Sequence, residues 1–102
     1  MPGPLRRKTP SCSELLRVLA DETRLGILRH LADGARCVFE LQEELDVDRS
    51  LLSHHLRVLR QAGFVDAHRE GKTVRYSVLP RVLVQRRGAE RIDLGCCELV
   101  FP

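Results

Sequence analysis

The sequence lacks the features that mark membrane, secreted and repeat proteins. No apolar run approaches the roughly 20 residues that a membrane-spanning helix needs. No apolar stretch of a secretory signal follows the basic start at Arg6, Arg7 and Lys8. Internal repeats and low-complexity segments are also absent. We therefore expect a cytoplasmic protein with no membrane partner, whose four cysteines are thiols or metal ligands rather than structural disulfides.

Signatures of cysteine enzymes are missing as well. The chain has no Cys-x-x-Cys redox motif, no phosphate-type anion loop and no βαβ pattern, which argues against a thiol oxidoreductase. The cysteines at positions 12, 37, 96 and 97 match no zinc-finger spacing, which argues against structural zinc. We expect a protein that is not an enzyme.

What the sequence does contain is one domain's worth of an ordinary globular chain with an uneven charge. It has 102 residues, of which 43% are hydrophobic and 30% are charged. Residues 11–48 carry four Arg against nine Asp and Glu, whereas residues 49–91 carry ten Lys and Arg against three Asp and Glu. The basic block predicts a surface that faces a polyanion, although a merely solvated charged face would look the same.

Helical signals precede strand signals along the chain. The apolar spacing predicts helices from Ser11 or Ser13 to about residue 19, and at about residues 22–32, 38–45 and 49–61. Ser11 with Glu14, Asp21 and Asp48 supply the N-terminal caps. The spacing then alternates, and a Gly-containing turn at residues 69–72 predicts a β-hairpin within residues 65–78. Further on, residues 82–84 fit a short helix or strand, and residues 92–101 look extended, with an interruption at Gly95-Cys96-Cys97.

The helix expected at residues 49–61 has two chemically different faces. At about 100° per residue, one arc is apolar except for a histidine: Leu51, Leu52, His55, Leu56, Val58, Leu59 and Ala62. The other arc offers donors for base edges and phosphates and holds no carboxylate: Arg49, Ser50, Ser53, His54, Arg57, Arg60 and Gln61. With the helix before it, this helix predicts a helix-turn-helix; an ordinary amphipathic surface helix is the alternative.

The adjacent histidines have different expected roles. His54 lies on the polar arc, where it could reach a phosphate or a base. His55 lies on the apolar arc, where we expect a partly buried structural residue hydrogen-bonded to the backbone. Neither has a second ligand four residues away, which argues against a metal role.

The hairpin is a candidate wing beside the second helix of this motif. His68, Arg69, Lys72 and Arg75 flank its tip, and positive tips of this kind contact the phosphate backbone or lie over the minor groove. The alternative is a solubilising turn. These patterns predict a mainly α fold with a small β-hairpin: a flexible basic arm at residues 1–10, a winged helix-turn-helix at 11–80 and an extension at 81–102.

Three motifs in this order resemble a known family. Leu19-Ala20-Asp21-Glu22-Thr23-Arg24-Leu25 is similar to its "LADPTRL" opening, and residues 53–59 (SHHLRVL) are similar to its "S-x-H-L-x-x-L" recognition helix. Residues 62–65 (AGFV) and 69–76 (REGKTVRY) resemble its entry to the wing. Together these motifs cover roughly residues 12–79, and the family is that of the ArsR/SmtB metalloregulators.

The resemblance implies a homodimeric winged helix-turn-helix repressor that binds a double-stranded operator with an inverted repeat. Family members leave the operator when a metal or metalloid binds, and so derepress a resistance operon. From the polar helical arc and the basic hairpin tip, the candidate DNA-binding residues are Arg49, Ser50, Ser53, His54, Arg57, Arg69, Lys72 and Arg75. The dimer of such proteins uses the first helix and a last helix, but the segment after the wing here is poor in helix signals.

The residues available for a sensor site are thiols rather than imidazoles. No His follows His68, which argues against a site for Zn²⁺, Co²⁺ or Ni²⁺. The family's Cys-x-Cys site on the third helix is incomplete, because Cys37-Val38-Phe39 has only its first thiol. Soft thiolates select thiophilic ions. The pair Cys96-Cys97 resembles the "LGCC" pair of an arsenic-sensing branch.

The number of thiolates in the site indicates which inducer it can bind. Arsenite and antimonite call for three thiolates, whereas methylarsenite has one bond filled by carbon and calls for two. Cys96 and Cys97 are the expected ligands of trivalent arsenic or antimony, with Cys37 or Cys12 as the candidate third ligand, from the same chain or its partner. The alternatives are a redox-sensing repressor that uses a Cys96–Cys97 disulfide, a Cd/Pb-type thiolate sensor, and a pair of thiols without function.

Overall fold

The computed structural model describes residues 10–86 and 88–101. The predicted basic arm at residues 1–10 lies outside the described residues except for Pro10. The helices are α1 (Cys12–Leu19), α2 (Glu22–Asp33), α3 (Val38–Leu45) and α4 (Arg49–Gln61). The strands are β1 (Arg36–Cys37), β2 (Val65–Glu70), β3 (Thr73–Val78), β4 (Leu83–Arg86), β5 (Ala89–Asp93) and β6 (Glu98–Val100).

The predicted N-terminal caps are present on three helices. The Ser11 hydroxyl accepts from the Glu14 backbone N–H at 3.2 Å, while a Glu14 carboxylate oxygen accepts from the Ser11 N–H at 2.8 Å. The Asp21 carboxylate accepts from the Arg24 N–H at 3.0 Å, and the Asp48 carboxylate accepts from the Ser50 N–H at 3.0 Å. These contacts satisfy backbone donors that have no partner within the helix, and they set where each helix begins.

The core is aliphatic except for Phe64, and it is shared by the helices and both sheets. The inner face of α4 packs against α2, and Phe64 and Val65 close the core where the chain leaves α4 for β2. The fully or almost fully buried side chains are Ile27, Leu28, Leu31, Leu41, Leu52, Leu56, Leu59, Phe64, Val65 and Ile92. Leu51, which the helical arc placed inward, is 48% exposed. That expectation was wrong because Leu51 lies in the first turn of α4, where the chain does not cover it.

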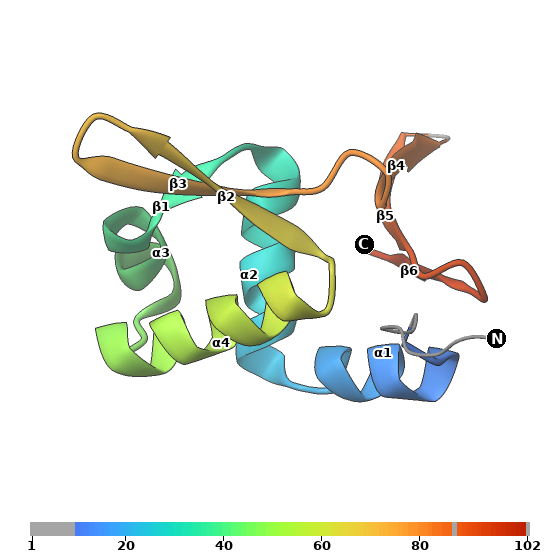
Figure 1. Cartoon of the computed structure of the whole chain (residues 1–102). Helices are drawn as coiled ribbons and strands as arrows, with labels where there is room; N and C mark the ends of the chain where they lie inside the picture. The colour runs from blue at the N-terminus through green and yellow to red at the C-terminus, as the bar shows by residue number, and fades with distance from the viewer. Residues whose placement is uncertain (1–9, 87, 102) are drawn as a thin grey trace, which may run out of the picture.

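The hairpin forms the predicted wing. Strands β2 and β3 pair antiparallel from Val65 opposite Val78 to Glu70 opposite Thr73. The turn needs Gly71, whose φ of 62° lies in the left-handed region. Two-residue β1 adds to the other edge of β3, so the sheet order is β1-β3-β2. The hairpin projects away from the C-terminal part of the chain (Figure 1).

The extension after Pro80 is a second, three-stranded antiparallel sheet in the order β4-β5-β6. The undecided segment around residues 82–84 is therefore largely strand, and the extended reading of residues 92–101 is confirmed apart from the turn at 94–97. Ile92 of β5 is fully buried in the common core, with Leu94 and Leu99 packed against it. The extension thus adds more strand than the expected hairpin alone, and it stands beside α1 in Figure 1.

Candidate functional site: a basic helix face and a cysteine cluster

The outward face of α4 presents the polar residues predicted from the helical arc. Arg49, Ser50, Ser53, His54, Arg57, Arg60 and Gln61 are all exposed. The Arg60 guanidinium lies 3.8 Å from the Asp66 carboxylate, whereas Arg49 and Arg57 have no ion pair to any residue that the structure describes. Two guanidinium groups, two hydroxyls and an imidazole are therefore free to meet an external polyanion.

α4 is the second helix of a helix-turn-helix. α3 packs against it, and residues 46–48 connect the two helices. Asp46 takes the left-handed conformation with φ of 54° and donates its N–H to the Gln42 carbonyl, which ends α3. Asp48 then caps α4. The apolar inner face of α4 is buried, so the helix is held with its polar face outward.

The structure separates the two histidines as expected, but gives His55 a different partner. His54 is exposed, whereas His55 is 7% exposed. Its Nε2 lies 4.0 Å from a carboxylate oxygen of Asp21, and its Nδ1 has no hydrogen-bond partner among the described residues. The expected backbone hydrogen bond was therefore wrong. Helix geometry placed His55 inward, but only the tertiary structure brings the start of α2 against it.

Burial favours the neutral form of His55. It lowers the pKa of His55 from its ordinary 6.5; the Asp21 carboxylate opposes this shift, while the charges of Arg24 and His54 add to it. The pKa of Asp21 is also lowered, chiefly because its carboxylate accepts the Arg24 backbone N–H. At the contact between α2 and α4, a carboxylate thus lies beside an imidazole whose neutral form is favoured.

Three of the four candidate wing residues lie exposed near its tip: His68, Arg69 and Lys72. Arg75 pairs directly with His68 across the hairpin but differs in being only partly exposed. Its guanidinium donates to the Ala35 carbonyl at 3.3 Å and lies 3.7 Å from the Glu40 carboxylate. The structure therefore gives Arg75 a role in joining the wing to α3, which sequence spacing did not reveal.

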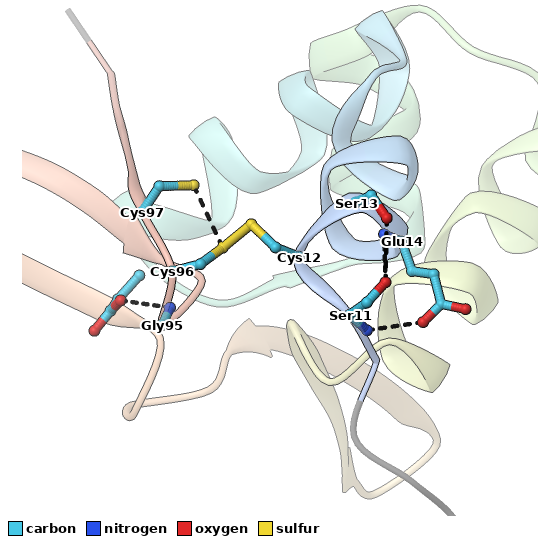
Figure 2. The surroundings of a disulfide bond; sticks show 8 residues. Ser11, Cys12, Ser13, Glu14, Gly95, Cys96 and Cys97 are labelled. Atoms are coloured by element: carbon cyan, nitrogen blue, oxygen red, sulfur yellow. Dashed lines mark hydrogen bonds between the residues drawn. A yellow bond between two sulfur atoms is a disulfide. The ribbon is translucent and has the colours of Figure 1, made fainter.

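A second cluster brings together cysteines that are 84 residues apart in the chain. The sulfur atoms of Cys12, Cys96 and Cys97 all lie within 4.8 Å of one another. Cys12 is the first residue of α1, whereas Cys96 and Cys97 occupy the turn between β5 and β6 (Figure 2). Cys12 is partly buried and the other two are exposed. Of the two candidate third thiols, the structure brings Cys12 to the pair.

The turn that carries Cys96 and Cys97 is fixed by its own backbone. The Asp93 carboxylate accepts from the Gly95 N–H at 2.8 Å, and the Leu94 N–H donates to the Cys97 carbonyl at 2.9 Å. Gly95 adopts φ of 91°, which favours glycine. Sequence reasoning missed Asp93 as a supporting residue, although Asp two residues before Gly is a known turn signal.

Cys12 and Cys96 are joined by a disulfide, with their Cα atoms 6.2 Å apart, and the Cys97 sulfur lies 3.8 Å from that of Cys96. The expectation of thiols or metal ligands rather than disulfides was therefore wrong for Cys12 and Cys96 in this state, and the alternative Cys96–Cys97 disulfide was also wrong, whereas Cys37 and Cys97 are free. Disulfides usually span about 4.4–6.8 Å between Cα atoms, whereas consecutive Cα atoms lie about 3.8 Å apart. The distant pair meets this requirement and the adjacent pair does not.

Cys37 stands outside this cluster. It is a free, partly buried cysteine at the start of α3, where its backbone N–H donates to the Glu40 carboxylate at 2.9 Å. That hydrogen bond is the main reason why the pKa of Glu40 is lowered. Cys37 serves helix capping in this fold and lies apart from the sulfur atoms of the other three cysteines.

Comparison with known proteins decides the family. Residues 21–67 match the model for "Bacterial regulatory protein, arsR family". HlyU from Vibrio cholerae superposes with a TM-score of 0.60 at 42% identity, over 63% of this chain and 70% of that one. The chain belongs to the ArsR family. Its regulators are not enzymes, in agreement with the sequence analysis.

Curated ArsR-family relatives are similar to this chain over its winged helix-turn-helix. The repressor SmtB of Mycobacterium tuberculosis is 41% identical over 73 residues, 72% of this chain and 54% of the relative. The arsenical resistance operon repressor of Escherichia coli is 40% identical over 70 residues, 68% of this chain and 60% of the relative. The cadmium regulator CadC of Listeria innocua is 38% identical over 71 residues, 69% of this chain and 60% of the relative. The chain thus spans between 54% and 60% of the length of these relatives.

A further structural neighbour is the winged helix-turn-helix domain of Mb0332 from Mycobacterium bovis, described as homodimeric and as part of "a possible ArsR-family transcriptional regulator". It superposes with a TM-score of 0.60 at 33% identity, over 63% of this chain and 59% of that one. None of the helices in the described part of our chain is long and apolar enough to cross a membrane.

The two histidines give a first prediction. His55→Ala should lower the free energy of unfolding by on the order of 2 kcal/mol, because it removes a buried side chain from between α2 and α4. His54→Ala should leave stability unchanged and weaken DNA binding, because His54 is exposed on the outward face. Urea unfolding and DNA titration of both variants test this. Equal behaviour of the two variants would contradict the assignment of faces.

The lowered pKa of His55 gives a second prediction. Because the folded state holds this pKa below 6.5, the unfolded chain takes up the proton first as the pH falls. The stability due to neutral His55 is therefore fully present above about pH 6.5 and is lost as the pH falls from there through the folded pKa. Urea unfolding between about pH 7 and pH 5 should show this loss. His55→Gln should flatten the slope and His54→Gln should keep it; an unchanged slope in His55→Gln would refute the prediction.

Proposed function

We propose that the chain is a DNA-binding transcriptional repressor that leaves its operator when cysteine thiolates bind a trivalent thiophilic metalloid. The ligands are Cys96 and Cys97, with Cys12 of the same chain as the third. The inducer is arsenite, antimonite or methylarsenite, and the consequence is derepression of a resistance operon. The observation that carries the sensor proposal is the convergence of these three sulfur atoms within 4.8 Å.

DNA binding rests on the chemistry of the α4 face and of the wing. Arg49 and Arg57 can neutralise phosphates, and Ser50, Ser53 and His54 offer short polar contacts to base edges or backbone. Arg69 and Lys72 extend the positive surface to the wing tip. Arg75 supports the wing through its contacts with Ala35 and Glu40, so we assign it an indirect part in binding.

A homodimer suits the exposed apolar side of α1. Leu16 is 48% exposed, and Leu15 and Val18 line a groove with Val58 of α4 and with Ala62, the residue that follows α4. The homodimeric description of the Mycobacterium bovis neighbour supports a twofold assembly of this kind. Two recognition helices related by a twofold axis read an inverted repeat, with half-sites about one helical turn apart.

The number and type of sulfur ligands favour the inorganic trivalent ions. Three thiolates provide a complete set for arsenite or antimonite, whereas Cys96 and Cys97 alone suffice for methylarsenite. Thiolates are soft ligands that prefer soft ions, and no imidazole joins the described cluster. A bound trivalent arsenic or antimony atom supplies bonds to sulfur, while the chain determines which segments those bonds connect. Cadmium, the metal in the name of one relative, suits the same soft ligands and belongs among the tested ions.

The chain offers a short route from the cysteines to the DNA-binding helix. Cys12 begins α1, and α1 leads through Leu19 and Ala20 directly to Asp21, which caps α2 and faces His55 of α4. A ligand that holds Cys12 against the β5–β6 turn therefore constrains the start of α1. Because the end of α1 leads into Asp21, the same ligand also constrains the contact between α2 and α4. Release requires that the ligand bind the low-affinity conformation more tightly than the DNA-bound one.

The proposed parts are a winged helix-turn-helix at residues 11–80 and a sensor extension at residues 81–102. Because Ile92 is fully buried in the common core, the extension folds as part of the same domain. A repressor acts where the DNA is, so we place the protein in the cytoplasm.

The DNA interface is tested by salt dependence. Arg57→Ala should weaken binding to operator and unrelated DNA alike, and should reduce the slope of log K against log salt by about one unit, because one phosphate contact is lost. Arg17→Ala is the matched control, since Arg17 is exposed on α1. Fluorescence anisotropy at several salt concentrations measures both. A slope that Arg57→Ala leaves unchanged would remove Arg57 from the interface.

The sensor is tested by metalloid titration of the reduced repressor on DNA from upstream of its own gene. Cys96→Ser and Cys97→Ser should each keep DNA binding and lose release. Cys12→Ser should impair release by arsenite and antimonite more than by methylarsenite, because it removes the third thiolate. Cys37→Ser, outside the cluster, is the control. The proposal fails if the Cys96/Cys97 double variant releases DNA at wild-type metalloid concentrations.

A further inference from the structure

We propose that Cys12 and Cys96 are also an oxidation-sensitive pair. Their disulfide makes the same connection between α1 and the β5–β6 turn that a bound metalloid would make, so a hydroperoxide acts as a second inducer. This inference rests on the proposed repressor function for its effect on DNA. Its chemical part, the pairing of Cys12 with Cys96 on oxidation, stands on the geometry of the cluster.

The cluster distinguishes this pair from the alternatives. Cys12 and Cys96 are joined with a Cα separation of 6.2 Å, while Cys97 and Cys37 are free thiols. The adjacent pair Cys96-Cys97 has its Cα atoms closer than disulfides normally allow. Disulfides in cytoplasmic proteins are usually transient and redox-sensing. The pairing therefore suits a switch better than a permanent structural link.

Access favours attack at the turn. Cys96 is exposed and Cys12 is only partly buried, so a small oxidant can reach either sulfur without unfolding the core. The Cys96 thiolate attacks the peroxide oxygen, giving a sulfenic acid and releasing hydroxide. The Cys12 thiol then attacks the sulfenic sulfur, forming the disulfide and expelling water. In sum, two thiols lose two electrons and two protons, and one hydrogen peroxide becomes two waters.

The disulfide and the metalloid site exclude each other. Oxidation removes two of the three thiolates and leaves Cys97, whose sulfur lies 3.8 Å from that of Cys96. The connection between the segments is nevertheless retained, because the disulfide holds residues 84 positions apart against each other. Figure 2 shows it joining the first turn of α1 to the strand-connecting turn. Oxidant and metalloid thus compete for the same sulfurs and constrain the same two segments.

The experiment compares hydrogen peroxide with potassium antimonyl tartrate on the reduced full chain. The readouts are free-thiol content, peptide mapping of the disulfide, and operator binding by anisotropy before and after dithiothreitol. Peroxide should form the Cys12–Cys96 disulfide and weaken operator binding by at least about fivefold, the low end of typical allosteric coupling, and dithiothreitol should reverse both. The oxidised protein should also melt at a higher temperature, because a long loop of the unfolded chain is closed.

Three variants separate the two inputs. Cys97→Ser should keep the response to peroxide and lose that to antimony, Cys12→Ser should lose the response to peroxide, and Cys37→Ser should keep both. The inference is overturned if peroxide links Cys96 to Cys97, if Cys12→Ser responds as the wild type does, or if the oxidised protein binds its operator as tightly as the reduced one. Release by peroxide without release by antimony would instead refute the proposed metalloid function. Release by antimony alone would refute only the oxidative input.

Discussion

The packing of α4 against α2 is the constraint on which the rest of this molecule depends. Leu52, Leu56 and Leu59 are completely buried against a core that includes Ile27 and Leu28 of α2. At roughly 25 cal/mol per Å² of apolar surface, burial of each such side chain contributes about 2 kcal/mol. Because the inner face of α4 is firmly packed, its outer face has one fixed orientation. The arginines of that outer face therefore keep a position from which they can contact DNA.

His55 gives that packing an electrostatic element. A buried imidazole that lies 4.0 Å from the Asp21 carboxylate is sensitive to small changes in the position of α2. Asp21 is also the residue at which α1 passes into α2, and it caps α2 through the Arg24 N–H. A displacement of α1 therefore reaches a cap, a carboxylate and the back of α4 together. The proposed release mechanism uses this link, because through it a contact at Cys12 would affect the proposed DNA-binding face without touching it.

Local patterns were sufficient for the helices, their caps and the wing. Residues 38–45 and 49–61 were predicted with the bounds that the structure shows, because periodicity and capping by Asp48 are local signals. The exposure of Leu51 and the Asp21 partner of His55 were missed, since both depend on which elements meet in three dimensions. The resemblance helped in the same region, but after Pro80 it pointed only to the cysteine pair. There a second sheet stands where such proteins have a last helix, in keeping with the weak helix signals of this segment.

For the candidate sensor too, local sequence predicted one part and the tertiary structure decided the rest. The adjacent cysteines marked it from sequence alone, but the choice between Cys12 and Cys37 required the tertiary structure, because one lies 84 residues from Cys96 and no local pattern links them. Ile92 supplies the reason for the outcome: once its burial fixes β5 in the core, the following turn lies beside the start of α1. Cys37 is held at the start of α3 because β1, to which it belongs, pairs with β3 of the wing, and because its backbone N–H donates to the Glu40 carboxylate. Hydrophobic packing in the extension therefore decides which cysteines meet, and the chemistry of the proposed metalloid site follows from that packing.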